Sequence, residues 1–371
     1  MLLRYTMLSR KPAIFKAMTG LTVALFDDLV WDLGPTYGAA EYERKERPGR
    51  QRAVGGGRHC RLGVRDEFLL TVVWLRHYFT QEALGYFFAV SDTTALRAIA
   101  RTLPVLEGAG RDTMRQPPPS RRARLGVAEA LRAYPELADL DDESRVVDSW
   151  EQRTQRPTDH QEADEHYSGK KKAHTLKSQI VVELGTGNVR EISPSVPGPV
   201  ADPPLLRDSG MRERLGPDHH ALGDLGYVGA DKDKGDTGKD KASGKGKGAK
   251  GRGKSKGAKG QNKGKGEEDK EDKEDKEDKE RAAGVTPRIV TPRRKPRGQP
   301  RPPEDVVFNR TFARARIVVE HSIRDIRIYQ ALSQVDRHRH RRKGHERRVC
   351  AVVGLRARRC RPGRRDQRRA A

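Results

Sequence analysis

The chain has little of what builds a packed interior. Hydrophobic residues make up 34% of its 371 residues and aromatic residues 5%, whereas charged residues make up 35%. This composition predicts a folded core with polar appendages. No apolar run reaches the roughly 18 residues of a membrane-spanning helix. Arg4, Arg10 and Lys16 also interrupt the first 31 residues, so we expect neither a signal peptide nor a membrane partner.

Cysteine is scarce as well. Cys60, Cys350 and Cys360 are odd in number and show no Cys-x-x-Cys spacing. They therefore do not form a disulfide framework, and a reducing cytoplasm is the expected location. The histidines at 338, 340 and 345 lack the cysteine partners of a zinc site, which favours a basic surface there.

What the chain has in excess is positive charge. Its 76 Lys and Arg residues against 52 Asp and Glu residues give a formal net charge of +24, which implies a polyanionic partner. Residues 337–371 hold 15 Lys and Arg against 2 Asp and Glu. We expect a basic C-terminal tail over 336–371 that either is solvated or lies against DNA phosphates. Residues 231–284 consist largely of Lys-Gly and Glu-Asp-Lys repeats and are expected to be a low-complexity, disordered insert.

The N-terminal part of the chain shows helical patterns. Residues 1–31 form an N-terminal helical segment, and residues 32–62 are expected to be a loop rich in Gly and Arg. In the domain at 64–107, three helices are expected at Asp66–Tyr78, Thr80–Ala89 and Ser91–Leu106, with Thr80 and Ser91 as N-caps. This pattern fits a helix-turn-helix and, equally, any three-helix unit.

The third of these helices is expected to carry a buried stripe and a basic outer face. The apolar residues at helical spacing are Leu96, Ile99, Leu103 and Leu106. Arg97 and Arg101 would then remain outside and face DNA.

Two acids follow short apolar segments. Val146 and Val147 precede Asp148, and Ala221 and Leu222 precede Asp224, which predicts two strands with an acid at the carboxyl end of each. Another expected feature is a hairpin of strands at 175–183 and 188–193. Lys170, Lys172, His174 and Lys177 crowd positive charge into one segment, which suits phosphate, although lysine runs are often only solvated. An acid beside a phosphate clamp suggests metal-assisted phosphoryl transfer.

The clearest expected helix is Asp305–Arg327. Its apolar face consists of Phe308, Phe312, Ala315, Val319 and Ile326. Arg316, Glu320 and Arg327 fall on another face, because offsets of four and seven return to the same side.

Six motifs occur along the chain in one order. They are Asp148-Ser-Trp-Glu-Gln with Arg156-Pro157, Tyr167-Ser-Gly-Lys-Lys-Lys-x-His-Thr-Leu-Lys177, Val196-Pro-Gly-Pro-Val-Ala-Asp202, Gly223-Asp-Leu-Gly-Tyr-x-Gly229, Thr291-Pro-Arg-Arg-Lys-Pro296 and Arg316-Ile-Val-Val-Glu-His321. The series resembles the DDE superfamily endonucleases, specifically bacterial insertion-sequence transposases related to the Harbinger type. Many such relatives have Gly-Thr where this chain has Ser149-Trp150.

The resemblance implies an α/β fold. A mixed RNase H-like sheet flanked by helices would occupy 140–230 and 285–335, preceded by an all-α helix-turn-helix domain and interrupted by the disordered insert. Asp148 on the first strand, Asp224 on the fourth and Glu320 on the following helix would be catalytic. Carboxylates suit Mg²⁺ or Mn²⁺, and two such ions roughly 4 Å apart activate a nucleophile and stabilise the leaving oxygen.

Other residues take roles from the same resemblance. Asp202 matches a further metal ligand, with an N-cap before Pro203 as the alternative. Lys170, Lys172, His174 and Lys177 would hold the DNA backbone. Arg316 and Arg327 match basic positions that either contact DNA or neutralise the acids.

The predicted function is therefore a DNA transposase in the bacterial cytoplasm, associated with the nucleoid. Its partners would be double-stranded DNA of the element ends and target, with a homo-oligomer as one form of the DNA complex. Two alternatives remain: a helix-turn-helix protein whose acids are vestigial, and a metal-dependent nuclease that does not transpose.

Overall fold

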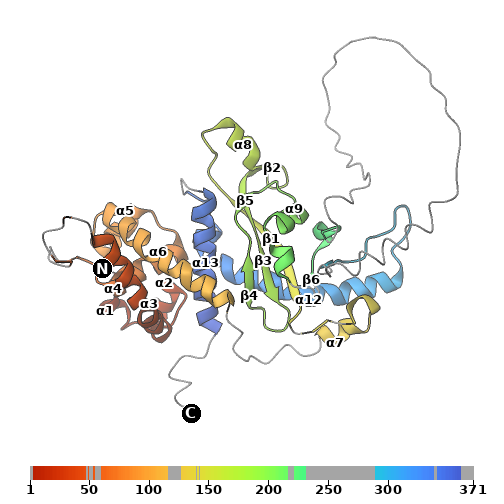
Figure 1. Ribbon diagram of the computed structural model, residues 1–371, viewed down its shortest axis with the longest axis horizontal. Coiled ribbons are helices and arrows are strands. Elements are labelled where there is room, and N and C mark those ends of the chain that lie inside the picture. Colours follow the sequence, from red (N-terminus) through yellow and green to blue (C-terminus); the bar gives the residue numbers. More distant parts are fainter. Residues whose placement is uncertain are drawn as a thin grey trace, which may run out of the picture.

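The computed structural model describes residues 3–46, 49, 53–54, 60–115, 127–138, 140–141, 143–215, 221–230, 289–337 and 341–360. The expected insert at 231–284 and the final residues of the expected tail, 361–371, lie outside the described residues. Figure 1 shows a helical domain beside a sheet-based domain, with α13 between them.

The helices and strands follow one another in an order that separates the two domains. The helices are α1 (Tyr5–Leu8), α2 (Pro12–Thr19), α3 (Val23–Lys45), α4 (Val64–His77), α5 (Gln81–Phe88), α6 (Asp92–Arg115), α7 (Val127–Arg132), α8 (His160–His166), α9 (Asp202–Asp208), α10 (Met211–Arg214), α12 (Pro303–Arg327) and α13 (Arg341–Cys360). The strands are β1 (Arg145–Arg153), β2 (Tyr167–Ser168), β3 (Ala173–Glu183), β4 (Val189–Ile192), β5 (Val196–Pro197), β6 (Ala221–Leu222) and β7 (Ile289–Val290). Short 3-10 turns occur at 135–137, 225–227 and 330–332.

The helical domain contains the three expected helices as α4, α5 and α6. Thr80 caps α5 by accepting a hydrogen bond from the Ala83 N–H at 3.2 Å, and Ser91 accepts one from the Thr94 N–H at 3.1 Å before α6. Both N-caps are thus confirmed. The turn between α5 and α6 is tight, because a Cβ on Gly85 would lie 2.7 Å from the Val90 carbonyl oxygen.

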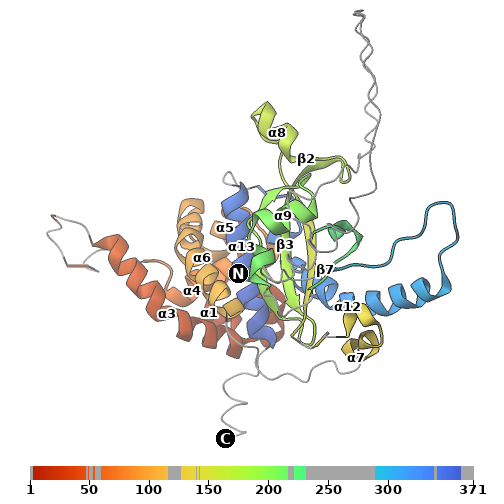
Figure 2. The same cartoon turned by 45° about the vertical axis from the view of Figure 1, so that its right-hand side comes forward.

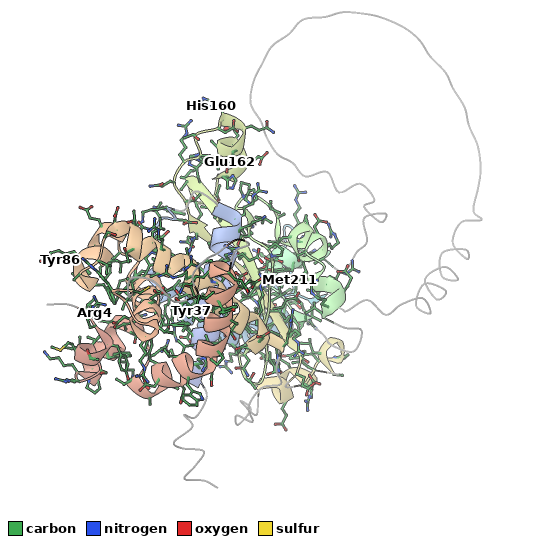
Figure 3. The ribbon with its side chains drawn as sticks, turned by 60° about the vertical axis from the view of Figure 1, so that its left-hand side comes forward. Arg4, Tyr37, Tyr86, His160, Glu162 and Met211 are labelled. Atoms are coloured by element: carbon green, nitrogen blue, oxygen red, sulfur yellow. The ribbon has the colours of Figure 1, made fainter. Side chains whose placement is uncertain are left out.

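Two expectations for the helical domain are corrected. Helix α3 continues to Lys45, so residues 32–45 are helical and not part of a loop. Tyr37 on this extension is buried and donates a hydrogen bond to Glu67 at 2.6 Å (Figure 3). On α6, Ile99, Leu103 and Leu106 are buried as predicted, but Leu96 is 47% exposed, and Ala95 and Ala98 are buried in the first turns instead.

The sheet-based domain is a mixed seven-stranded sheet. Its strands run in the order β2-β3-β1-β6-β7, and β4 and β5 also pair with β3. β1 is antiparallel to β3 and parallel to β6, and β6 is parallel to β7. The expected hairpin is present as β3 and β4. Helix α8, with His160 and Glu162, projects beyond the sheet (Figure 3).

Both faces of the sheet are covered, because successive side chains of a strand point to opposite faces. Val146 belongs to the cluster that includes Phe312 and Val319 of α12, whereas Val147 belongs to the cluster that includes Leu206 of α9 and Met211 of α10. Figure 1 shows α12 behind the sheet, and Figure 2 shows α9 in front of it. The adjacent valines of β1 therefore support two cores.

Helix α12 confirms the expected pattern. Its five predicted apolar residues are all buried, and Glu320 is exposed on another side. The observed helix begins at Pro303, two residues before the predicted start at Asp305.

The expectation of a C-terminal tail is wrong for residues 341–360. They form α13, which packs along α6 and buries Val349, Val352 and Leu355. The two helices approach at glycines, since a Cβ on Gly110 would lie 1.9 Å from the Cys350 carbonyl oxygen and one on Gly354 would lie 2.9 Å from the Gly110 Cα. Apolar residues among the arginines thus form a helix face that the charge count obscures.

Candidate active site

The sheet register places two of the predicted acids side by side. Val146 of β1 is paired with Leu222 of β6, and Asp148 and Asp224 each follow two residues later. Asp148 does not end its strand, because β1 continues to Arg153 along β3. It lies instead just beyond the end of the parallel neighbour β6. Asp224 lies two residues after the end of β6 and caps the following 3-10 turn by accepting a hydrogen bond from the Gly226 N–H at 2.7 Å.

Asp202 joins these two acids from α9. A Cβ on Gly226 would lie 2.8 Å from Asp224 Oδ1 and 3.1 Å from Asp202 Oδ2, so the two carboxylates approach the same glycine. Asp202 occupies the first turn of α9, whose N-cap is Ala201, and its side chain makes no cap. The N-cap alternative is therefore wrong. Tyr227 is buried beside the three acids, and burial followed by the charges of Asp202, Asp148 and Asp224 raises its pKa well above the ordinary value.

The acids are held by specific partners. Ser149 Oγ donates to Asp202 Oδ1 at 2.8 Å, and Lys177 Nζ lies 3.2 Å from the same oxygen. Arg316 of α12 pairs with Asp148 at 3.3 Å. Lys177 and Arg316 are thus bound to carboxylates, which agrees with the neutralising alternative for Arg316.

Asp148 is the most perturbed of these acids. Burial raises its pKa to about 6; Arg316 and the Ser149 N–H oppose this rise, while Asp224 and Asp202 add to it. A carboxyl whose ionised form is disfavoured in this way is typical of sites that bind a cation or transfer a proton.

Glu320 and the basic residues line a cavity of about 610 Å³ with Asp148 and Asp202. Glu320 is exposed on α12, one turn after Arg316. Lys170, Lys177 and Arg327, three of the residues expected to contact DNA, belong to the lining. The cavity therefore combines acids from β1, α9 and α12 with cations at its rim.

Four of the residues predicted to contact DNA lie outside this cavity. Lys172 is exposed in the turn before β3, and His174 lies with its ring 5.5 Å from that of Tyr167. Arg97 is exposed on α6. Arg101 is not outside as predicted: its guanidinium is bound by Glu67, with Nε 3.1 Å from Oε2, and only 19% of its side chain is exposed.

The cavity also includes residues that were not predicted as site residues. Lys171, Arg324, Ser149 and Glu151 line it, and Glu151 accepts a hydrogen bond from Thr175 at 2.8 Å. Arg324 follows Glu320 by one turn of α12, so helical spacing is the signal that could have identified it.

The carboxylates of the site are of the chemical type that binds a divalent cation, but they lie too far apart to hold one in this arrangement. Carboxylate oxygens are the ligands that Mg²⁺ and Mn²⁺ prefer. Within the described part of the chain, however, no three His, Cys, Asp or Glu side chains are close enough together to hold a metal ion. Asp148 and Asp202 have cationic side chains beside them instead.

Comparison with known proteins decides the family. The family model described as "DDE superfamily endonuclease" matches residues 147–355, which contain all four acids of the site. The chain belongs to the DDE superfamily endonucleases. A second family model, "Helix-turn-helix of DDE superfamily endonuclease", matches residues 60–112 and thus α4 to α6.

Two further comparisons place this DDE superfamily endonuclease among known proteins. It is 24% identical over 332 residues to the probable transposase for insertion sequence element IS702 of Microchaete diplosiphon, covering 89% of each chain. No solved structure matches it significantly. A helix-turn-helix followed by a mixed sheet is consistent with membership of this family. DDE superfamily nucleases generally use divalent metals. Among the helices of the described residues, none has both the length and the apolar character needed to cross a bilayer.

Proposed function

We propose that the protein is a DNA transposase that binds the ends of its mobile element, cleaves phosphodiester bonds and joins the freed 3′ ends to target DNA. The observation that carries this proposal is the convergence of Asp148, Asp202 and Asp224 beside the cavity that Glu320 and several cations line. The similarity to a probable insertion-sequence transposase over most of the chain supports the same function.

Asp148, Asp202, Asp224 and Glu320 would hold the divalent ions. Mg²⁺ or Mn²⁺, when bound, lowers the pKa of water or a 3′-hydroxyl and stabilises the leaving oxygen. The chain's own contribution is to position the acids. Ser149 orients Asp202 by its hydrogen bond, and the β1–β6 register keeps Asp148 beside Asp224.

The cations of the cavity divide into two groups. Lys170, Lys171, Arg324 and Arg327 lie at the rim and would bind the DNA phosphates next to the bond that is cut. Lys177 and Arg316 are bound to Asp202 and Asp148, so we assign them to the positioning of these acids. Arg97 on α6 would contact the element ends as part of the helix-turn-helix.

A specific observation favours a second candidate, a DNA-binding protein without catalysis. Asp148 and Asp202 are each paired with a cation, and the described residues offer no three-ligand metal site. Such pairing is expected if the acids keep only a structural role.

The experiment is cleavage of a labelled duplex that carries the DNA flanking the gene, with Mg²⁺ or Mn²⁺. Wild type is compared with Asp224→Asn and Glu320→Gln. If the protein is a transposase, wild type should make metal-dependent cuts at the element ends and then join these ends to a second duplex. Both variants should lose the cuts. Cuts without strand transfer would instead identify a nuclease. Binding of the ends with no cleavage above that of the variants would support the DNA-binding protein.

A further inference from the structure

A second cavity, of about 700 Å³, lies where the two domains meet. It is lined by the end of α6, the start of β1, Val181 of β3, the β4 edge of the sheet, α10 and α13. Figure 1 shows the end of α6 beside β4, and α13 along the same edge. The cavity shares no lining residue with the acid-lined cavity, and Arg145 precedes Asp148 by three positions, which corresponds to roughly 10 Å along a strand.

Arginine dominates the charge of this cavity. Its lining includes the five arginines Arg111, Arg115, Arg145, Arg190 and Arg214 and only two carboxylates, Glu191 and Glu346. The two carboxylates are each occupied. Glu346 pairs with Arg111 at 2.6 Å, and Glu191 pairs with Arg214.

Two of the remaining arginines lie beside each other. Arg145 and Arg190 share one carboxylate, Glu183, at 3.7 Å and 2.7 Å. Burial lowers the pKa of Arg145; Glu183 opposes this shift, the nearby Arg190 adds to it, and Glu143 and Asp141 oppose it. Arg115, at the exposed end of α6, has no ion pair with any described residue. Two adjacent guanidinium groups that share a carboxylate, next to a third arginine, form a site that an additional anion would stabilise.

The geometry of the arginines indicates the class of anion. Guanidinium groups bind phosphate oxygens through two parallel hydrogen bonds, and several arginines around one cavity suit a phosphate better than a single carboxylate. Arg111 and Arg115 of the cavity lining belong to α6, the helix that also carries Arg97. Arg97 and Arg115 lie 18 residues apart on α6, roughly 27 Å along the helix.

We propose that this arginine cavity binds a phosphate of the DNA backbone and is a second DNA contact of the protein, separate from the acid-lined cavity. The proposal rests on the proposed function only in taking DNA as the polyanion. A phosphate bound here contacts both domains, because Arg115 belongs to α6 of the helix-turn-helix and Arg145 to the catalytic sheet. DNA binding at this cavity therefore links the orientation of α6 to the sheet.

The test measures the affinity for a duplex of unrelated sequence, by fluorescence anisotropy, between about 50 and about 200 mM NaCl. The cavity variant is Arg115→Gln with Arg214→Gln. The matched control is Arg10→Gln with Arg44→Gln. Arg44 resembles Arg214 in exposure, 51% against 53%, and each of the two is paired with one glutamate, Glu41 and Glu191 respectively. Both variants remove two positive charges from exposed side chains of the full chain.

The expected result is a weaker affinity and a smaller salt slope for the cavity variant alone. The slope of log affinity against log salt should fall by about 0.9 for each DNA phosphate that the variant no longer binds. Equal slopes in the cavity variant and the control would overturn the proposal. Circular dichroism melting of both variants shows whether they fold as the wild type does. If the cavity variant does not fold, the single substitution Arg115→Gln, compared with Arg10→Gln, provides the same comparison.

A separate arm distinguishes backbone phosphate from free phosphate. Thermal melting is measured with inorganic phosphate and with chloride at equal ionic strength. Stabilisation of wild type by inorganic phosphate that the cavity variant lacks, together with an unchanged DNA salt slope, would overturn the assignment to DNA. Failure of the proposed function has a different signature, since Asp224→Asn would then cut as wild type does while the salt slopes still differ between the cavity variant and the control.

Discussion

Two Arg–Asp pairs in this protein have the same chemistry but different surroundings. Arg348 and Asp336 lie 2.6 Å apart at the junction of the two domains, and neither side chain is exposed. Asp336 also accepts a hydrogen bond from Tyr78 at 3.0 Å. Arg316 and Asp148 lie 3.3 Å apart beside the acid-lined cavity, with 12% and 18% of their side chains exposed.

The difference lies in the balance of charge. At the junction, Arg348 meets Asp336, and Tyr78 from the end of α4 joins this pair to the helical domain. At the cavity, Arg316 meets Asp148 while Asp224 and Asp202 repel the same carboxylate. A matched pair stabilises the contact of two domains. An excess of carboxylates reduces stability and leaves a site that can bind cations.

The largest effect on stability is expected from Asp336→Asn at the junction. This change leaves the buried Arg348 without a counter-charge, so the free energy of unfolding should fall by about 3–5 kcal/mol. The control is Asp32→Asn, which breaks the exposed pair with Arg358 and should cost less than about 1 kcal/mol. Urea unfolding monitored by circular dichroism measures both. Similar losses in the two variants would contradict the role of the buried pair.

The packing of α13 on α6 is expected to be nearly as sensitive. Gly110→Ala places a Cβ against the Cys350 carbonyl, so α13 must move, which should destabilise the protein by about 3 kcal/mol. Gly108→Ala, two residues earlier on α6, meets no atom within 4 Å and should stabilise the helix by about 0.5–1 kcal/mol. Opposite shifts in melting temperature are the expected result. A shift of the same sign in both variants would show that the two helices do not pack closely at Gly110.

Acid should weaken the junction through His345 of α13. Burial, with Arg348 adding to it, lowers the pKa of this histidine from 6.5 to about 3. Below pH 6.5 the unfolded chain therefore binds a proton that the folded chain does not, and stability falls as the pH falls. Between pH 7 and pH 5 the loss should be about 2 kcal/mol.

The variant His345→Gln isolates this effect, because Gln does not titrate. Between pH 7 and pH 5, the loss in its free energy of unfolding should be about 2 kcal/mol smaller than the loss in wild type. Asp148, whose pKa is raised, changes stability in the opposite direction and is present in both proteins. The same pH dependence in wild type and variant would exclude His345 as the source.

The smallest effect is expected at the acid-lined cavity, and its sign is reversed. The raised pKa of Asp148 means that its ionised form opposes folding above about pH 6. Asp148→Asn should therefore raise the free energy of unfolding at pH 8, by about 1 kcal/mol. Asp305→Asn, which removes the partner of Arg293, should lower it by less than about 1 kcal/mol. A loss of stability in Asp148→Asn as large as in Asp336→Asn would remove the contrast between the two regions.

Much of the fold could be predicted from local patterns. The sequence pattern within a few residues predicts the apolar face of α12 and the N-caps Thr80 and Ser91, and the structure confirms all three. The adjacency of Asp148 and Asp224 was also predictable, because each follows a short apolar segment and these two segments pair in parallel. The position of Asp202 beside these two acids could be predicted only from the motif resemblance, because the sequence around Asp202 does not show where α9 places it.

The errors concern features that depend on distant partners. The arginines around α13 predicted a tail, but the apolar face of this helix is buried against α6 through Gly110 and Gly354. Arg101 was expected outside, and only the packing of α4 on α6 brings Glu67 to it. The arginine cavity combines residues from six helices and strands and therefore has no signature within a single segment.

The most direct test of the central claim compares wild type with Asp148→Asn on the same labelled duplex of the flanking DNA. Both proteins are first brought to equal occupancy of the duplex, and Mg²⁺ is then added. The account predicts that wild type cuts the DNA, whereas Asp148→Asn binds it equally well and cuts at least about 100-fold more slowly, since loss of a ligand exceeds the effect of losing an outer-shell partner. Equal cleavage by the two proteins, or no cleavage by either, would contradict it.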